Sequence, residues 1–246
     1  NNFDESIYQF HSCYRRRLWI DELDDDTRVY VRFEAVMTAA VVYLNGQVVG
    51  EHRGGYTQFR VDLTQHALPD AFNTLVVHVD STERRDTPPF GHVLDYLTFG
   101  GIYREVTLEY VHAIHINAAV IKPRNVLTPE PGMEIDLHFI NHRESPTEVT
   151  AAVRLLRDGT VHSDTAHSLA IDSSFQQRCR LTVSLPEVEL WSIEEPTLYH
   201  VAIELRENDT PVGAYEYRIG FREIEITPTG FSLNGEPRKL RGLNRH

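Results

Sequence analysis

Nearly every periodic segment of this chain repeats every two residues, and that pattern most constrains what the chain can fold into. Val29–Val36 alternates apolar and mixed positions, and Ala40–Leu44 is a run typical of a buried strand. Side chains of a strand point alternately to the two faces of a sheet, so this periodicity predicts β-strands. The one helical hint is Leu63–Leu68, which Pro69 closes after about one turn. The chain is therefore predicted to be all-β.

Three short turn motifs support this prediction. Asn45-Gly46, Asp158-Gly159 and Asn234-Gly235 each follow or separate strand-like runs. A type I′ hairpin turn needs positive φ at both central residues, which Asn, Asp and Gly accept at low cost. We therefore predict a hairpin at each of the three places.

The remaining predicted strands divide the chain into two β-sandwiches and a short third part. In residues 1–111 they are Gln47–Gly50, Thr57–Asp62, Leu75–Val79 and Arg104–Tyr110. In residues 112–223 they are Ile116–Lys122, Glu134–Asn141, Thr147–Arg157, Gln177–Ser184, Tyr199–Glu207 and Val212–Gly220. About seven strands in roughly 110 residues suit an immunoglobulin-like sandwich in the second part.

The third part, residues 224–246, is predicted to hold a linker within Glu223–Thr229, a hairpin and the opening of a new element. A strand that has just begun cannot bury its apolar face alone. We therefore expect the chain to be a piece of a longer polypeptide that continues into another domain.

The charge, the cysteines, the histidines and the lengths of apolar runs narrow the classes of function and location that are expected. A net charge of -12 argues against a nucleic-acid surface, and Arg15-Arg16-Arg17 is interpreted as a solvated strand edge. The only cysteines, Cys13 and Cys179, are far apart in sequence and favour a reducing compartment, so a cytoplasmic location is predicted. The sequence has no apolar run long enough to span a bilayer, and its 13 His show no metal-binding spacing.

Four motifs, in order and spacing, carry a resemblance to a known family. They are Val42–Phe59 with Asn45-Gly46 and Gly54-Gly55-Tyr56, Gly100–Val106, Leu190–Tyr199 with Glu195-Pro196, and Gly220–Arg222 running into Leu233–His246. Together they resemble glycoside hydrolase family 2, the group of β-galactosidases, β-glucuronidases and β-mannosidases.

The resemblance implies a fold and a chemistry. It makes residues 1–111 a jelly-roll sugar-binding domain, residues 112–223 an immunoglobulin-like domain, and residues 224–246 the start of a (β/α)₈ barrel. Such enzymes cleave β-glycosides with retention through two Glu carboxylates, one an acid and one a nucleophile. In the family both stand on barrel strands, so no catalytic residue is expected in this chain, which should be inactive alone. A β-galactoside is the implied substrate, and the barrel and a homo-oligomer are the implied partners.

Two residues are candidates for substrate binding, by resemblance. Asp95 precedes the Gly-Ile-Tyr-Arg strand, where β-galactosidases of the family place an Asp that contacts sugar hydroxyls and, in some members, a monovalent cation. His246 closes an Asn-Arg-His triplet whose His lines the sugar subsite. Na⁺ and Mg²⁺ are the candidate ions of the full-length enzyme, and no cofactor is otherwise indicated.

Two alternatives stay open. The chain could be a tandem β-sandwich carbohydrate-binding or adhesin module with no enzyme attached. Within the family it could belong to a β-glucuronidase or β-mannosidase. Gly54-Gly55-Tyr56 is interpreted as a turn followed by a core aromatic rather than as a sugar-binding loop.

Overall fold

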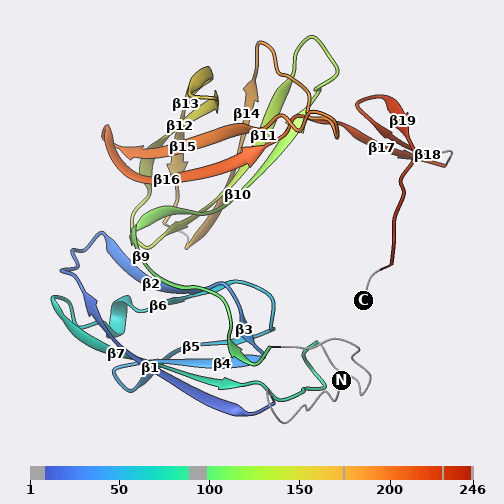
Figure 1. Cartoon of the computed structure of the whole chain (residues 1–246). Helices are drawn as coiled ribbons and strands as arrows, with labels where there is room; N and C mark the ends of the chain where they lie inside the picture. The colour runs from blue at the N-terminus through green and yellow to red at the C-terminus, as the bar shows by residue number, and fades with distance from the viewer. Residues whose placement is uncertain (1–8, 89–98, 174, 229, 245–246) are drawn as a thin grey trace. The chain divides into compact units, whose positions relative to one another are not determined.

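The computed structural model describes residues 9–88, 99–173, 175–228 and 230–244. The chain divides into two compact units (Figure 1), unit 1 ending at Val111 and unit 2 spanning His112–Asn244. Across the described residues, no helix has the length and apolar character that crossing a bilayer requires.

Unit 1 is a β-sandwich. Its elements are β1 (His11–Ile20), β2 (Thr27–Phe33), β3 (Val36–Met37), β4 (Ala39–Leu44), β5 (Gln47–Arg53), β6 (Phe59–Asp62), the 3₁₀ turn η2 (Thr64–His66), β7 (Ala71–Asp80), β8 (Gly101–Ile102) and β9 (Val106–His112). One sheet has the order β1-β7-β4-β5, a second has the order β6-β2-β9, and β3 pairs with β8.

The core of unit 1 lies between these sheets. On β7, Leu75, Val77 and Val79 are buried, while the residues between them are half-buried, as alternation requires. They pack in one cluster with Phe33 of β2 and Leu44 of β4. The alternating pattern of the sequence therefore decides which face of each strand meets the core.

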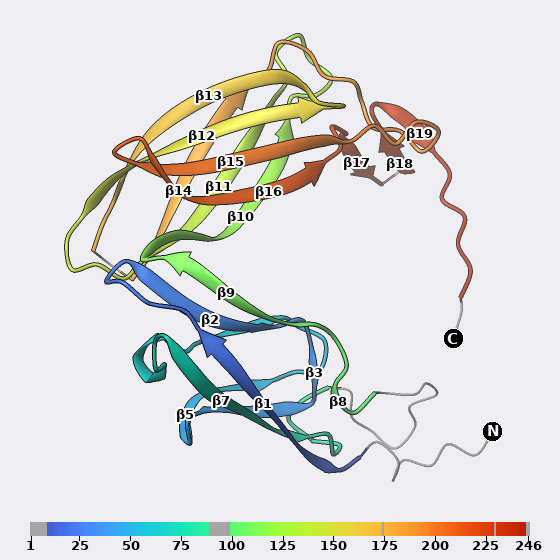
Figure 2. The ribbon, with the colours of Figure 1, turned by 60° about the vertical axis from the view of Figure 1, so that its left-hand side comes forward.

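Unit 2 is a second, larger sandwich. Its strands are β10 (Ile114–Arg124), β11 (Gly132–Asn141), β12 (Thr147–Arg157), β13 (Thr160–Ile171), β14 (Gln176–Ser184), β15 (Tyr199–Glu207), β16 (Thr210–Ile219), β17 (Ile224–Thr227), β18 (Gly230–Leu233) and β19 (Glu236–Arg238). Figure 2 shows the sheet β13-β12-β15-β16 as one layer and β10-β11-β14 as the other. The last three strands form a small separate sheet.

The predicted hairpin turns are confirmed by their backbone angles. Asn45 and Gly46 have φ of 51° and 86°, and both positions are also positive at Asp158-Gly159 and Asn234-Gly235. A fourth turn of this kind, Asn208-Asp209, joins β15 to β16 and was not predicted. The all-β class with two successive sandwiches is likewise confirmed.

Three details differ from the sequence predictions. Strand β13 was not identified, because it is a sheet edge with one exposed face and small or polar side chains. Glu223–Thr229, predicted as a linker, contains β17. Tyr56 is 48% exposed and so is not a core residue, whereas Gly55 is buried.

Candidate functional site

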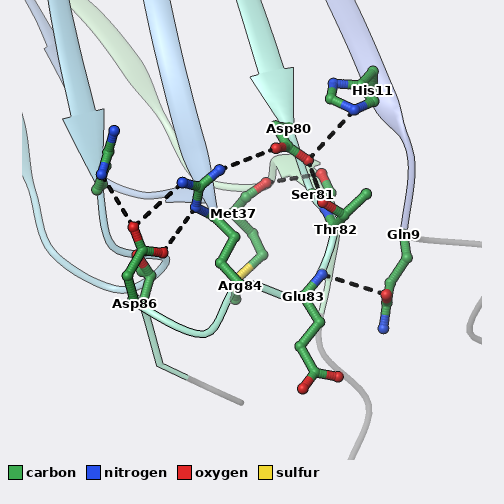
Figure 3. Close-up of polar contacts among 11 residues, drawn as sticks. Gln9, His11, Met37, Asp80, Ser81, Thr82, Glu83, Arg84 and Asp86 are labelled. Atoms are coloured by element: carbon green, nitrogen blue, oxygen red, sulfur yellow. Dashed lines mark hydrogen bonds and ion pairs between the residues drawn. The ribbon is translucent and has the colours of Figure 1, made fainter. Parts of the chain in front are cut away.

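A polar cluster stands at one end of the sheet β1-β7-β4-β5 in unit 1 (Figure 3). We call His11, Arg53, Asp80, Arg84 and Asp86 the strand-end cluster. The register pairs His11 of β1 with Asp80 of β7, and both Asp80 and Arg53 of β5 pair with one residue of β4. Because antiparallel partners share a face, the side chains from these three strands gather in one row.

Arg84 links the two carboxylates of the cluster, and Figure 3 shows it between them. Its Nη1 lies 3.4 Å from Asp80 Oδ2, and its Nε and Nη2 donate to Asp86 at 3.1 and 3.3 Å. Arg53 Nη1 donates to Asp86 Oδ2 at 3.1 Å. His11 Nε2 lies 3.8 Å from Asp80 Oδ1, which also accepts bonds from the amide and hydroxyl of Thr82. The cluster thus ties β1, β5 and β7 to the loop after β7.

These contacts keep both carboxylates ionised. Burial acts to raise the pKa of Asp80, but the hydrogen bonds from Thr82 and the charges of His11 and Arg84 outweigh it and hold that pKa below its usual value. The side-chain hydrogen bond from Arg84 lowers the pKa of Asp86, and the same bond raises the pKa of Arg84. A general acid needs a carboxyl that is neutral near the working pH, so these two are suited to bracing and not to proton transfer.

A cavity of about 460 Å³ lies beside the cluster. Its lining includes His11, His78, Val41, Glu51 and Arg53, and the rings of His11 and His78 stack with centroids 5.4 Å apart. Mixed donors, acceptors and ring faces suit a polar ligand held by hydrogen bonds.

The connection between Ser81 and Gly101 is held at both of its ends by one hydroxyl. Ser81 Oγ donates to Met37 O at 2.8 Å and accepts from Gly101 N at 2.8 Å, and the serine is buried. Gly101 has φ of 79°, a conformation that glycine accepts more readily than other residues. A side chain there would also collide with the hydroxyl of Tyr14. The geometry of this joint therefore depends on the serine hydroxyl at position 81 and on the glycine at position 101.

Two of the sequence motifs meet at this joint. Tyr103 Oη donates to Gly55 O at 2.6 Å, which joins the Gly-Ile-Tyr-Arg motif to Gly54-Gly55-Tyr56. A Cβ on Gly55 would overlap the end of the Met37 side chain, so a larger residue there would force that side chain to move. The contacts of Tyr103, Gly55 and Met37 therefore give both motifs a structural role in unit 1.

The other two motifs meet in unit 2. Trp191 N donates to Phe221 O at 2.8 Å, and Trp191 O accepts from Asn234 Nδ2 at 3.0 Å. Gly220 leaves room for the indole, and the guanidinium of Arg222 lies 4.7 Å from its ring centroid. Trp191 therefore anchors the β17-β18-β19 sheet to the sandwich.

The predicted binding residues, Asp95 and His246, both lie outside the described residues, so the structure does not place them. Within the described ranges, no group of three or more His, Cys, Asp or Glu side chains could hold a metal ion.

Sequence reasoning did not single out the strand-end cluster. One local signal was available, since Asp80-Ser81-Thr82 directly after a strand is a common turn in which the Asp carboxylate accepts the amide of Thr82. The partners Arg53 and Asp86 are 33 residues apart, and no spacing rule connects them.

Family comparisons cover nearly all of the chain. Residues 3–111 match the sugar-binding domain model of glycosyl hydrolases family 2, and residues 114–222 match a second model of the same family. The chain belongs to glycosyl hydrolases family 2. Unit 1 is thus the jelly-roll sugar-binding domain of the family, and the sandwich of unit 2 is its immunoglobulin-like domain.

Individual family 2 members align over the whole chain. β-Galactosidases of Thermoanaerobacterium thermosulfurigenes and Thermoanaerobacter pseudethanolicus are 37% and 35% identical over 100% and 99% of it, which is 34% and 33% of their own lengths. The crystal structure of Bacteroides uniformis β-glucuronidase superposes with a TM-score of 0.84 and 30% identity, over 97% of this chain and 30% of that one. The chain spans about a third of the length of the curated relatives that it matches.

Proposed function

We propose that this chain is the N-terminal, non-catalytic portion of a cytoplasmic retaining β-galactosidase. In this proposal both units support a catalytic barrel, and the connection from Ser81 to Gly101 contributes Asp95 to the sugar pocket. The observation that carries it is the joint at Ser81, where one buried side chain holds both ends of that connection. Pre-organised ends restrict where the middle of a connection can reach, which is what a substrate-contacting loop requires.

The protonation states of Asp80 and Asp86 bear on where the catalytic carboxyls lie. A retaining glycosidase needs one neutral and one ionised carboxyl about 5 Å apart. Asp80 and Asp86 are both held ionised by arginine and by hydrogen bonds, so neither suits the acid role. We assign both catalytic carboxyls to the barrel. Asp95 and His246 are assigned to hydroxyl recognition, and Asp95 also to a monovalent cation such as Na⁺.

The first test compares this chain with the longer gene product on nitrophenyl β-galactoside. We expect turnover only from the longer protein, which we also expect to form a homo-oligomer. Turnover by residues 1–246 alone at a rate near that of the longer protein would overturn the assignment of the catalytic carboxyls.

The second test replaces Asp95 by Ala in the longer protein. Loss of a charge-assisted hydrogen bond to the sugar should lower kcat/KM roughly a hundredfold. Asp164→Ala, at an exposed position of β13, removes the same charge and should leave kcat/KM unchanged. Equal kcat/KM values for the two variants would show that Asp95 does not contact the sugar.

A β-glucuronidase is the second candidate, favoured by the likeness to the Bacteroides uniformis enzyme. Glucuronate carries a carboxylate, and its recognition calls for a cationic partner. The ratio of kcat/KM on nitrophenyl β-galactoside to that on nitrophenyl β-glucuronide decides between the two. We expect the galactoside to be preferred.

A further inference from the structure

The outer face of the sheet β1-β7-β4-β5 carries a trough that follows β4. Ala40 and Val42 of β4 are buried in the core, so the residues before each of them point to the opposite, outer face. The register places each of these outward residues directly between one residue of β7 and one of β5. The members of this β4 trough are Ala39 and Val41 of β4, His78 and Asp80 of β7, and Glu51 and Arg53 of β5. All six line the cavity of about 460 Å³ described above.

The β4 trough has an apolar floor and polar walls. Ala39 and Val41 form the floor, whose two positions lie about 7 Å apart along the strand. The walls stand on the two neighbouring strands, roughly 10 Å from each other across the sheet. A pyranose ring has the matching distribution of polarity, because its faces carry C–H groups and its rim carries hydroxyls. The cavity volume also lies within the range of about 300–1,000 Å³ that small-molecule sites have.

The charges that line the cavity balance each other. The guanidinium groups of Arg53 and Arg84 stand against the carboxylates of Glu51 and Asp80. Arg84 and Asp80 already bond to each other, with Nη1 3.4 Å from Oδ2. A lining with no excess of either sign gives little preference for an ion, so a neutral ligand is favoured.

The β5 wall holds the groups that are available to such a ligand. Among the described residues, the side chain of Glu51 forms no ion pair and no hydrogen bond. Arg53 uses only Nη1, which bonds to Asp86, and its other guanidinium nitrogens have no partner in the same ranges. A carboxylate acceptor and a guanidinium donor on one wall suit hydroxyl groups, since a hydroxyl can both donate and accept.

The walls are held in place by contacts outside the β4 trough. The ring of His11 stacks on that of His78, with centroids 5.4 Å apart. Arg84 bonds to both Asp80 and Asp86, as Figure 3 shows. Side chains that are fixed before binding lose less conformational entropy when a ligand arrives.

We propose that the β4 trough binds one neutral pyranose ring. The ring face lies on Ala39 and Val41, and ring hydroxyls bond to Glu51 and Arg53 on one wall and to His78 on the other. This site needs neither Asp95 nor the barrel, so it is a second sugar contact, in addition to the pocket that we propose for hydrolysis.

The probe is methyl β-D-galactopyranoside, titrated to about 0.1 M into the ¹⁵N-labelled 246-residue chain and followed by NMR. A single ring should bind with a dissociation constant on the order of 1–10 mM, and the largest amide shifts should be those of Ala39, Val41 and Glu51. Methyl β-D-galacturonide, which adds a carboxylate, should bind at least fivefold more weakly because the lining has no excess positive charge. Sorbitol should also bind at least fivefold more weakly, since an open-chain polyol offers no ring face and loses more conformational freedom.

Two variants test the placement. Glu51→Gln should weaken galactoside binding at least fivefold, because a charge-assisted acceptor becomes a neutral amide. Its matched control, Glu22→Gln, removes the same charge from an exposed position after β1 and should change the affinity less than twofold. Val41→Trp should fill the β4 trough and weaken binding at least tenfold, whereas Val161→Trp adds the same ring at an exposed position of β13 and should have no effect. The amide spectrum of each variant shows whether its fold is retained, and Glu51→Gln tests the site independently of Val41→Trp.

Several results would overturn the proposal. Absence of amide shifts at about 0.1 M galactoside, or equal affinities of Glu51→Gln and Glu22→Gln, would mean that the β4 trough holds no sugar. Equally tight binding of the galacturonide would mean an anion site, and equally tight binding of sorbitol would mean that hydroxyls are bound without a ring. Asp95→Ala in the same chain should leave the affinity unchanged. A loss of affinity there would place the sugar at Asp95, which would contradict this inference and support the proposed function.

Discussion

The two sandwiches of this chain are closed in different ways. Unit 2 joins its long strands by tight hairpins such as Asp158-Gly159 and Asn208-Asp209, and its buried core draws on strands of both sheets. Unit 1 has the smaller buried core, and one of its ends is held by side chains that bond to backbone, with Ser81 at the centre. Unit 1 also has a cleft of about 340 Å³ beside β1, which the core residues Phe33, Leu75 and Val77 help to line.

This difference suits unit 2 to structural support and unit 1 to ligand binding. Continuous backbone ladders and a larger core are expected to make unit 2 the more stable of the two. Unit 1 leaves part of its core accessible and places charged side chains at strand ends, which is where binding sites on β-scaffolds occur. We therefore expect the same kind of substitution to have different consequences in the two units.

The largest expected effect is that of a buried leucine. Leu44 of unit 1 and Leu155 of unit 2 are both fully buried in their cores. Truncation of either to Ala should cost about 3 kcal/mol, from lost burial and the cavity left behind. Because unit 1 has the smaller core, Leu44→Ala should abolish its calorimetric transition, whereas Leu155→Ala should only lower the melting temperature of unit 2.

Val161→Ala, at an exposed position of β13, is the control and should leave both transitions in place. If Leu155→Ala unfolds unit 2 while Leu44→Ala is tolerated, unit 1 is the more stable of the two units.

The second effect concerns a buried carboxylate of unit 2. Asp136 is 2% exposed and accepts hydrogen bonds from Arg180 and Arg178, which hold its pKa far below the usual value. Asp136→Asn should lower the melting temperature of unit 2 by on the order of 10 °C at pH 7. Because the folded pKa is depressed, the wild-type advantage is complete above about pH 5 and shrinks as pH falls toward 2. Melting curves at pH 7 and pH 3 measure it, and a gap that widens in acid would contradict the assignment.

The sequence predicted the regular parts of the fold well, for a physical reason. Thr147–Arg157 and Tyr199–Glu207 were predicted with the bounds that β12 and β15 have, because both are central strands with one buried face. β13 is an edge strand that pairs only with β12, and its sequence lacks the regular apolar alternation of a central strand. The turn at Asp158-Gly159 was the only sequence signal for where it begins.

The candidate site was less predictable than the fold. The pairing of Arg53 with Asp86 and the two bonds of Ser81 depend on which strand ends come together, which local patterns do not specify. The family motifs did indicate residues that meet, as Tyr103 and Gly55 do, but the motifs did not say what joins them.

A smaller effect is expected from Ser81→Ala in unit 1. The change leaves Gly101 N and Met37 O buried without their partner, at a cost of about 1–3 kcal/mol. Ser12→Ala is a matched control, because the Ser12 hydroxyl is buried and has no hydrogen-bond partner among the described residues, so its removal should be neutral or stabilising. Urea denaturation monitored by fluorescence gives both values. Equal destabilisation by the two variants would show that the joint at Ser81 adds nothing beyond packing.

The smallest effect is expected at the exposed end of the strand-end cluster. The side chain of Asp86 is 50% exposed, so its bonds to Arg84 and Arg53 compete with water and are screened by salt. Asp86→Asn should change the melting temperature of unit 1 by about 2 °C or less. Because the pKa of Asp86 is lowered in the folded state, the loss should be complete at neutral pH and should shrink only as the pH falls below about 4. Asp25→Asn, in an exposed turn, removes the same charge without an ion pair among the described residues and serves as the control. The melting temperature of each variant is measured at 0.05 and 1 M NaCl. The effect of Asp86→Asn should fade at the higher salt concentration, and that of Asp136→Asn should persist. A loss of melting temperature for Asp86→Asn that persists at 1 M NaCl and equals the loss for Asp136→Asn would contradict this prediction. It would mean that the strand-end cluster stabilises unit 1 as much as Asp136 stabilises unit 2.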